Sequence, residues 1–149
     1  PDLALSSDFI VGFPGESDAD FEQTMQLVRE IGFSQAYTFK YSSRPGTPAA
    51  DMDGHVPEQL KSERLQVLQA EINRQQQDFN EDSVGQELPV LFDRQSARDG
   101  QLVGRSPYMQ SVHAELSATH IGDIIPVMID RANPNSLSGV VRQRREAVA

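Results

Sequence analysis

The sequence contains no cysteine, few basic residues and no apolar run of the roughly 18–20 residues that a membrane span requires. Without cysteine, its 149 residues cannot form a disulfide framework, supply a thiol nucleophile or ligate a bound iron–sulfur cluster. The 13 Lys and Arg residues stand against 22 Asp and Glu residues, and the net charge of -9 argues against general binding of polyanions. The first residues have neither an initiator Met nor the basic region of a signal peptide, and we expect a reducing, cytoplasmic location.

The charge is distributed unevenly along the chain. Residues 1–82 carry 6 basic and 15 acidic side chains, whereas residues 83–149 carry 7 of each. The pattern changes at the same place, from alternating strand-like and helix-like segments to successive short strands separated by turns. We therefore predict a boundary near residues 80–86, with an α/β domain at 1–82 followed by an all-β domain at 83–149.

The first domain begins with an apolar segment, residues 8–12, which is typical of a buried parallel strand. Ser17 is a good N-cap for a helix that ends at Gly32, and residues 35–41 form a second predicted strand. We expect parallel pairing through a right-handed crossover. This unit and one long helix, with Pro57 in its first turn, cannot cover both faces of a parallel sheet, so further strands are needed from elsewhere. Bare sheet edges would favour dimerisation of such a piece.

Each predicted helix has an apolar side that should face a core. These residues are Phe21, Met25, Val28 and Ile31 in the first helix and Leu60, Leu65, Leu68, Ile72 and Phe79 in the second.

The second domain contains five predicted strands with turn residues between them. Such a series of short strands is typical of a small closed or partly open barrel of the OB type. Pro89 and Pro126 fall inside two of the strands, which predicts a strand end, an edge or a bulge at each. The strands are expected at residues 87–94, 101–106, 110–116, 123–131 and 136–143.

Several segments resemble a known enzyme family. Residues 8–16 (Asp-Phe-Ile-Val-Gly-Phe-Pro-Gly-Glu) and 39–49 (Phe-Lys-Tyr-Ser-Ser-Arg-Pro-Gly-Thr-Pro-Ala) are similar to the closing strands of the radical-SAM (β/α) barrel in methylthiotransferases. Residues 104–106 and 135–139 resemble parts of the TRAM domain that ends those enzymes. Within the family, residues 102–108 are most similar to members that modify tRNA, and members that modify a ribosomal-protein aspartate are near relatives.

The resemblance implies a complete enzyme that uses S-adenosylmethionine radical chemistry and two 4Fe-4S clusters. Its product would be a methylthio group on the isopentenylated adenosine next to the tRNA anticodon. The family's cluster-binding cysteines are absent here, so we expect this chain to be a C-terminal piece that is inactive alone, with neither catalytic nor metal-binding residues. Its expected partners are the upstream domains of the enzyme and the anticodon stem-loop.

The resemblance also suggests where the cofactor lies. In radical-SAM enzymes the strand similar to residues 8–16 has its backbone near the cofactor's adenine. Arg44 follows the second strand at the edge where parallel sheets bind ligands, and its guanidinium could hold the cofactor's carboxylate or a phosphate. A loop-stabilising salt bridge is the alternative role for Arg44. The candidate cofactor contacts are Ile10, Val11, Gly12, Pro14 and Arg44.

Exposed residues of the second domain are candidates for contact with RNA. Arg105 could bind a phosphate and Tyr108 could stack on a base, while the alternative is that Arg105 packs over a buried Tyr108. His113 and Arg142, in the short basic tail, complete the set.

Two other functions compete with the enzyme fragment. The chain could be a free-standing nucleic-acid-binding module in which the α/β part is a scaffold. It could also be a small α/β enzyme with Asp8 or Glu16 as general base, although no convergent set of catalytic groups accompanies them.

Overall fold

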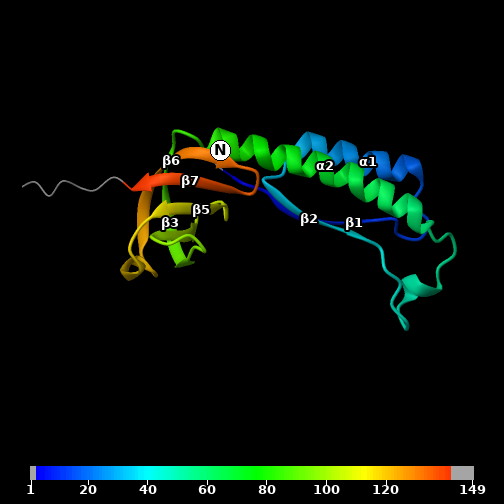
Figure 1. The fold of residues 1–149 in the computed structure, drawn as a ribbon. Coiled ribbons are helices and arrows are strands. Elements are labelled where there is room, and N and C mark those ends of the chain that lie inside the picture. The colour runs from blue at the N-terminus through cyan, green and yellow to red at the C-terminus, as the bar shows by residue number, and fades with distance from the viewer. Residues whose placement is uncertain (1–2, 142–149) are drawn as a thin grey trace, which may run out of the picture. The chain divides into compact units, whose positions relative to one another are not determined.

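The computed structural model describes residues 3–141, and the chain divides into two compact units, Pro1–Gln76 and Gln77–Ala149 (Figure 1). The first unit is α/β and the second is built around a closed five-stranded β-barrel, which confirms the predicted fold class. The elements of the first unit are β1 (Ser6–Val11), α1 (Asp18–Ile31), β2 (Gln35–Lys40), the 3₁₀ helix η1 (Pro48–Asp51) and α2 (Glu58–Asp82). The last residues of α2, from Gln77 onward, group with the second unit.

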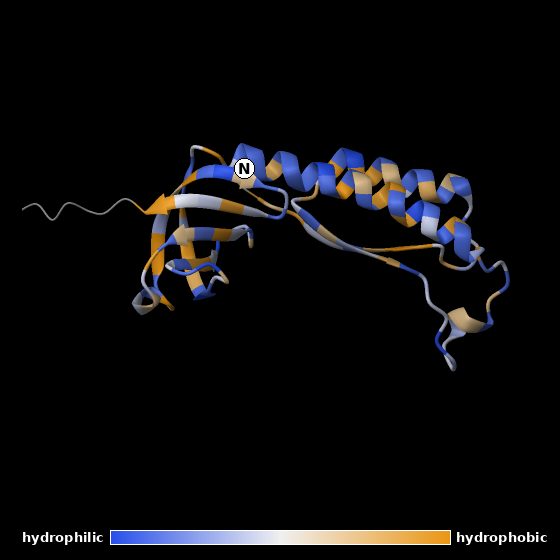
Figure 2. Ribbon diagram, in the orientation of Figure 1, coloured by the Kyte–Doolittle hydropathy of each residue, from blue (hydrophilic) through white to orange (hydrophobic). Residues whose placement is uncertain are grey.

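The first unit is a two-stranded parallel sheet with both helices on one face. The pairing runs in register from Ser6 opposite Gln35 to Val11 opposite Lys40, as the parallel prediction requires. Helices α1 and α2 lie side by side (Figure 1), and hydrophobic residues interrupt the hydrophilic surface of each (Figure 2). The buried cluster between helices and sheet consists of Phe9, Val11, Met25, Val28, Phe33, Leu68 and Ile72.

Both ends of α1 follow from local sequence. The Ser17 hydroxyl accepts a hydrogen bond from the Asp20 amide, and the Asp20 carboxylate accepts one from the Ser17 amide, so the two residues form a capping box. Hydrogen bonds from Ser17 lower the pKa of the Asp20 carboxyl below its usual value. Gly32 ends the helix in the left-handed conformation at φ 69°, which a residue with a side chain adopts only with strain.

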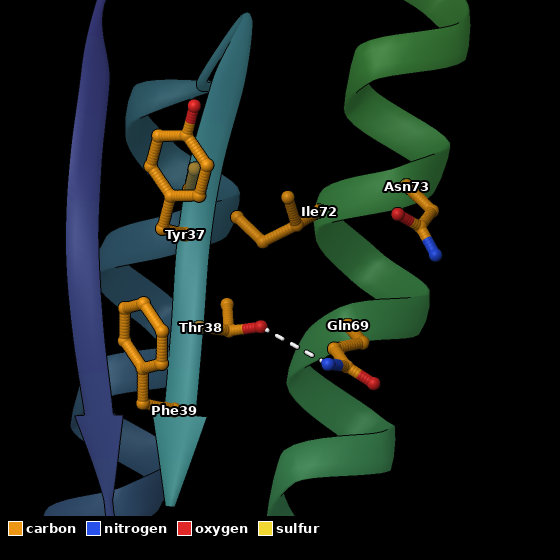
Figure 3. A pocket seen from close by; sticks show the side chains of 7 residues that line it. Tyr37, Thr38, Phe39, Gln69, Ile72 and Asn73 are labelled. Carbon is orange, nitrogen blue, oxygen red and sulfur yellow. Dashed lines mark hydrogen bonds between the residues drawn. The ribbon is translucent and has the colours of Figure 1, made fainter. Parts of the chain in front are cut away.

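The opposite face of the sheet is uncovered in the part of the chain that the structure describes. Ile10, Tyr37 and Phe39 are 58%, 59% and 53% exposed on that face. Figure 3 shows the alternation along β2, where Thr38 points toward α2 and the rings of Tyr37 and Phe39 lie on the other side of the strand. This bare apolar face agrees with the expectation that the first unit needs additional elements.

Some expected core positions were wrong. Ile31, placed on the buried side of α1, is 40% exposed because it lies in the last turn of the helix, beyond the packed cluster. Phe79 does not join the first core, since its ring contacts Tyr108 in the second unit. Helix α2 begins at Glu58, and the carbonyl oxygen of Pro57, immediately before it, accepts a hydrogen bond from the Lys61 amide that closes the first turn.

The second unit contains all five predicted strands. They are β3 (Glu87–Gln95), β4 (Gln101–Arg105), β5 (Ser111–Glu115), β6 (Ile124–Asn133) and β7 (Ser136–Val141), with the 3₁₀ helix η2 (Ala118–His120) between β5 and β6. The barrel order is β3-β4-β5-β7-β6, and only the β5–β7 pair is parallel. The core consists of Leu88, Val90, Phe92, Leu102, Val112, Ala114, Val127, Ile129 and Leu137.

The two strand prolines lie opposite each other in the β3–β6 pair. Within the described residues, β4 pairs with β3 only from Leu91 onward, and β7 pairs with β6 only from Val127 onward. Among these residues, Pro89 and Pro126 each have only one neighbouring strand, so both lie on locally unpaired edges, which is one of the three predicted alternatives.

Two glycines allow the strands of the barrel to approach closely. A Cβ atom on Gly104 would lie 2.5 Å from the Leu91 carbonyl oxygen and 2.6 Å from Cγ1 of Val90. A Cβ atom on Gly139 would lie 2.5 Å from both the Met128 carbonyl oxygen and Cγ1 of Val127. Because the obstacles include backbone atoms of a neighbouring strand, neither position accepts a side chain without movement of the barrel.

We predict that Gly104→Ala lowers the free energy of unfolding by about 1–3 kcal/mol, as overpacking typically does. Denaturant unfolding followed by circular dichroism measures the effect. Val140→Ala is the control, because Val140 is 52% exposed on a strand of the same barrel and its truncation leaves no buried cavity. Equal stability of Gly104→Ala and the unchanged chain would contradict the prediction.

Candidate functional site

A buried arginine joins the start of α1 to α2 in the first unit. Arg64 is 4% exposed, and its Nη1 donates to the Glu16 carboxylate at 2.7 Å and to the Glu16 carbonyl oxygen at 3.1 Å. Its Nη2 donates to Asp18 at 2.6 Å, and the guanidinium lies 5.5 Å from the centre of the Phe21 ring. The turn that follows β1 is therefore fixed to α2 by charge-assisted hydrogen bonds.

Glu16 is fully engaged by this arrangement. One carboxylate oxygen accepts from Arg64, and the other accepts from the Gly12 amide at 2.9 Å. Gly12 has φ 73°, and a Cβ atom there would overlap the side chain of Lys61. Both oxygens of Glu16 hold the turn, so the geometry does not support its use as a general base.

The end of β2 is fixed to the same helix by lysines. Lys61 donates to the Tyr41 carbonyl oxygen at 3.2 Å and forms an ion pair with Glu58 at 2.9 Å. Lys40, the last residue of β2, also pairs with Glu58. The hydrogen bonds from Lys40 and Lys61 lower the pKa of Glu58 to about 2. The carboxyl ends of both strands are thus positioned by the first turns of α2.

A cavity of about 400 Å³ lies between β2 and α2 within the first unit. Gln69 donates to the Thr38 hydroxyl at 3.2 Å across it, and Asn73 lies one turn further along the helix (Figure 3). None of the residues that line this cavity is a predicted site residue.

A second cavity, of about 550 Å³, lies at the carboxyl ends of β1 and β2. Ile10, Phe39 and Arg44 line it together with Phe13 and Tyr41. Within residues 3–141 the Arg44 guanidinium has no ion pair, and the Tyr41 hydroxyl is buried without a hydrogen-bond partner. The cavity therefore combines an apolar surface with a cation, which suits a ligand that carries both a flat ring and a carboxylate.

The structure separates the five predicted cofactor residues into two groups. Ile10 and Arg44 line the cavity at the strand ends. Val11, Gly12 and Pro14 are buried, and the Val11 carbonyl oxygen already accepts a hydrogen bond from the Tyr41 amide. These three residues shape the turn, whereas the side chains that can meet a ligand are those of Ile10 and Arg44.

In the second unit, the segment after β4 is largely engaged in packing. Tyr108 is half-buried against the barrel core, and its ring lies edge-on to Phe79 with the centroids 5.6 Å apart. Arg105 donates to the Met109 carbonyl oxygen at 3.3 Å across the tight turn. Met109 itself has φ 64°, a strained value for a residue with a side chain. A stacking role for Tyr108 would require its ring to leave this contact.

The buried part of the turn is held by a polar network. Gln110 donates to Asn80 at 2.9 Å and to Ser83 at 3.0 Å, and it accepts from Ser106. Asn80 and Ser83 are 2% and 4% exposed, so these hydrogen bonds satisfy buried groups at the end of α2.

His113 lies in the middle of β5 on the outer surface of the barrel. Burial, assisted by the nearby positive charges of Arg94 and Arg98, holds the pKa of its imidazole below the usual 6.5. Arg142, the remaining predicted RNA contact, lies outside the described residues, as do Arg144 and Arg145.

Several functional candidates were absent from the sequence prediction. Arg64 carries no motif that distinguishes it from other polar residues of a long helix. Arg131 is far from Arg94 and Arg98 in the chain, and only the strand pairing of the barrel brings it to the same surface. That pairing includes the parallel β5–β7 contact, which the order of strands along the sequence does not specify.

Among residues 3–141, no group of three or more His, Asp or Glu side chains is arranged to hold a metal ion. The same residues include no helix that is both long and apolar enough to span a membrane.

Comparison with known proteins finds a family model that matches part of the second unit and relatives that match most of the chain. Residues 81–141 match the family model of the TRAM domain. The chain is 56% identical over 137 residues to the tRNA-2-methylthio-N(6)-dimethylallyladenosine synthase of Sphingopyxis alaskensis, with 92% of this chain and 31% of the relative covered. It is 55% identical over 139 residues to the protein of the same name from Novosphingobium aromaticivorans, with 93% and 31% covered. The chain thus spans about a third of the length of these curated relatives.

We predict that Arg64→Ala destabilises the chain by about 3–5 kcal/mol, because the buried Glu16 carboxylate loses its counter-charge. Chemical denaturation monitored through loss of helix reports the change. The matched control is Arg29→Ala, which removes an arginine whose pair with Glu22 is exposed, and its cost should stay below about 1 kcal/mol. A similar loss for both variants would show that the Arg64 network has no special role.

Proposed function

We propose, from the premise that the chain is homologous to part of the tRNA-2-methylthio-N(6)-dimethylallyladenosine synthases, that it is one part of a radical-SAM tRNA methylthiotransferase. The complete enzyme would add a methylthio group to the isopentenylated adenosine beside the anticodon. The first unit supplies part of the cofactor-binding sheet, and the barrel binds the anticodon stem-loop. The chain alone is inactive in this proposal, and the cytoplasm is the compartment in which it would meet tRNA.

The observation that carries the proposal is the identity of 55–56% over more than nine-tenths of the chain, which includes both units. The names of both relatives favour a tRNA substrate over a ribosomal-protein aspartate. The same identity argues against the free-standing nucleic-acid module, since residues of the α/β unit are matched as well as the barrel. The uncovered sheet face supports a need for neighbouring elements, from the same enzyme or from a second copy of the chain.

The residues at the strand ends fit S-adenosylmethionine. When bound beside a reduced cluster, this cofactor supplies the radical and the methyl group of the reaction. Ile10 and Phe39 offer an apolar surface for the adenine, and the Arg44 guanidinium suits the methionine carboxylate. Val11, Gly12 and Pro14 act through the shape of the turn that Glu16 and Arg64 hold.

The iron–sulfur clusters fit no residues of this chain. Such clusters are held by cysteine thiolates, and the sequence contains no cysteine. Both clusters of the proposed enzyme must therefore be ligated by residues outside these 149.

The barrel supplies the RNA contacts in this proposal. Arg105 and His113 belong to neighbouring strands of the barrel wall, and their side chains can reach phosphates or bases. Tyr108 would stack on a base only after leaving Phe79, and Arg142, outside the described residues, is a further candidate contact. Small β-barrels of the OB type commonly bind oligonucleotides on their strands and loops.

The proposal predicts that the 149-residue chain binds a tRNA anticodon stem-loop with a salt-dependent affinity. Fluorescence anisotropy of a labelled stem-loop at several salt concentrations measures it, and the log–log slope counts phosphate contacts at about 0.7 each. A DNA hairpin of matching sequence is the control for recognition of the ribose 2′-hydroxyl. Absence of RNA binding at low salt would contradict the proposed role of the barrel.

We further predict that Arg105→Ala weakens stem-loop binding about threefold to tenfold, because one charged contact to a phosphate is lost. Arg29→Ala provides a control with the same loss of charge in the first unit. An unchanged affinity would mean that Arg105 does not contact RNA and that its role is limited to the hydrogen bond with Met109.

A further inference from the structure

The pairing of the barrel places a row of residues across all five strands. Arg94 lies opposite Val103, Val103 opposite His113, and His113 opposite Ser138. Ser138 in turn lies opposite Arg131. Residues directly opposite in neighbouring strands share one face of a sheet, so two arginines and a histidine are joined by a single lateral row.

This row faces outward. Leu102, Val112 and Leu137 are the residues that precede Val103, His113 and Ser138 along their strands, and all three are buried in the barrel core. Since side chains alternate between the faces of a strand, the row points away from the barrel core, although Val103 within it is only 4% exposed.

A groove of about 390 Å³ follows the row on this surface. Arg98, from the loop between β3 and β4, and Arg131, from β6, both line it together with His113. Gln101 and Ser138 add further hydrogen-bonding groups, and no Phe or Tyr side chain takes part.

The arginines of the described part of the second unit concentrate here. Three of the four, Arg94, Arg98 and Arg131, lie in the row or its groove, and Arg105 is the fourth. Arg94 pairs with Asp93 at 2.8 Å, whereas Arg98 and Arg131 form no ion pair within residues 3–141. Two guanidiniums are therefore available to an anion at this surface.

The remaining charges limit what the groove can hold. Glu115 and Asp130 also line it, so the surface is not a continuous cationic track. Carboxylates accept hydrogen bonds from the amino groups of bases, and guanidiniums donate to phosphates. This mixture suits a short single-stranded segment whose bases and phosphates both meet the protein.

We infer that the groove between Arg98 and Arg131 is a binding site for single-stranded RNA. The two guanidiniums hold backbone phosphates on either side, and the His113 imidazole contacts a base or a ribose 2′-hydroxyl. A protein partner is disfavoured because the groove has no aromatic anchor pocket of the kind that protein interfaces use. The inference rests on the proposed function and specifies which face of the barrel takes the RNA.

The test compares Arg98→Gln, Arg131→Gln and the double variant with the unchanged chain, using the labelled anticodon stem-loop across a range of salt concentrations. Each single variant should lower the affinity about threefold to tenfold and reduce the salt slope by about 0.7. The control is Arg29→Gln, which makes the same charge change on α1 in the first unit. Melting curves of each variant establish that the barrel remains folded, and the His113 ring signals in NMR should shift when RNA is added.

The outcomes separate this inference from the proposed function. If the unchanged chain binds RNA and both arginine variants bind it equally well with the same slope, the groove is not the RNA site, and the proposed function stands. If the unchanged chain does not bind RNA, both fail. Loss of affinity in the variants without any shift of His113 would overturn the placement of RNA along the groove.

Discussion

The hydrogen-bonding groups along every strand edge need a partner, and the two units differ in whether their strands provide one. In the barrel, each of the five strands has two neighbours, since the order β3-β4-β5-β7-β6 closes on itself. In the first unit, β1 and β2 pair only with each other among the described residues, and their second face carries exposed apolar side chains. The barrel is therefore closed by its own hydrogen bonding, whereas the sheet has strand edges and an apolar face without a partner among the described residues. A match to about a third of the length of the relatives is consistent with this difference.

The first turns of α2 determine what the incomplete sheet can present. Arg64 holds Glu16, and through Glu16 the Gly12 amide, so the turn after β1 has one conformation. Lys61 holds the carbonyl group at which β2 ends. Arg64 and Lys61, which make these contacts, both belong to α2. They hold the strand ends that border the cavity, although no residue of α2 lines it. The helix acts as a scaffold for a candidate ligand site that it does not line.

Local sequence was sufficient to predict the elements and their order. The capping box at Ser17 and the glycine stop at Gly32 are signals that depend on nearby residues alone, and the structure confirms both. The sequence could not assign the predicted cofactor residues to a ligand site or to the core, because Ile10 and Val11 differ only in which side of β1 they face. Tyr108 looked like an exposed aromatic, since its contact with Phe79 depends on a helix nearly 30 residues away. Likewise, the row through His113 depends on the parallel β5–β7 pair, which no local pattern encodes.

In the proposed complex, RNA lies on the outer surface of the barrel, next to His113 on β5 and the strands that flank it. Ultraviolet crosslinking of an anticodon stem-loop to the chain, followed by mass spectrometry of the crosslinked peptides, tests it most directly. We expect crosslinks in peptides from residues 94–141, with the peptide that contains His113 among them. Crosslinks confined to the first unit, within residues 3–76, would contradict it.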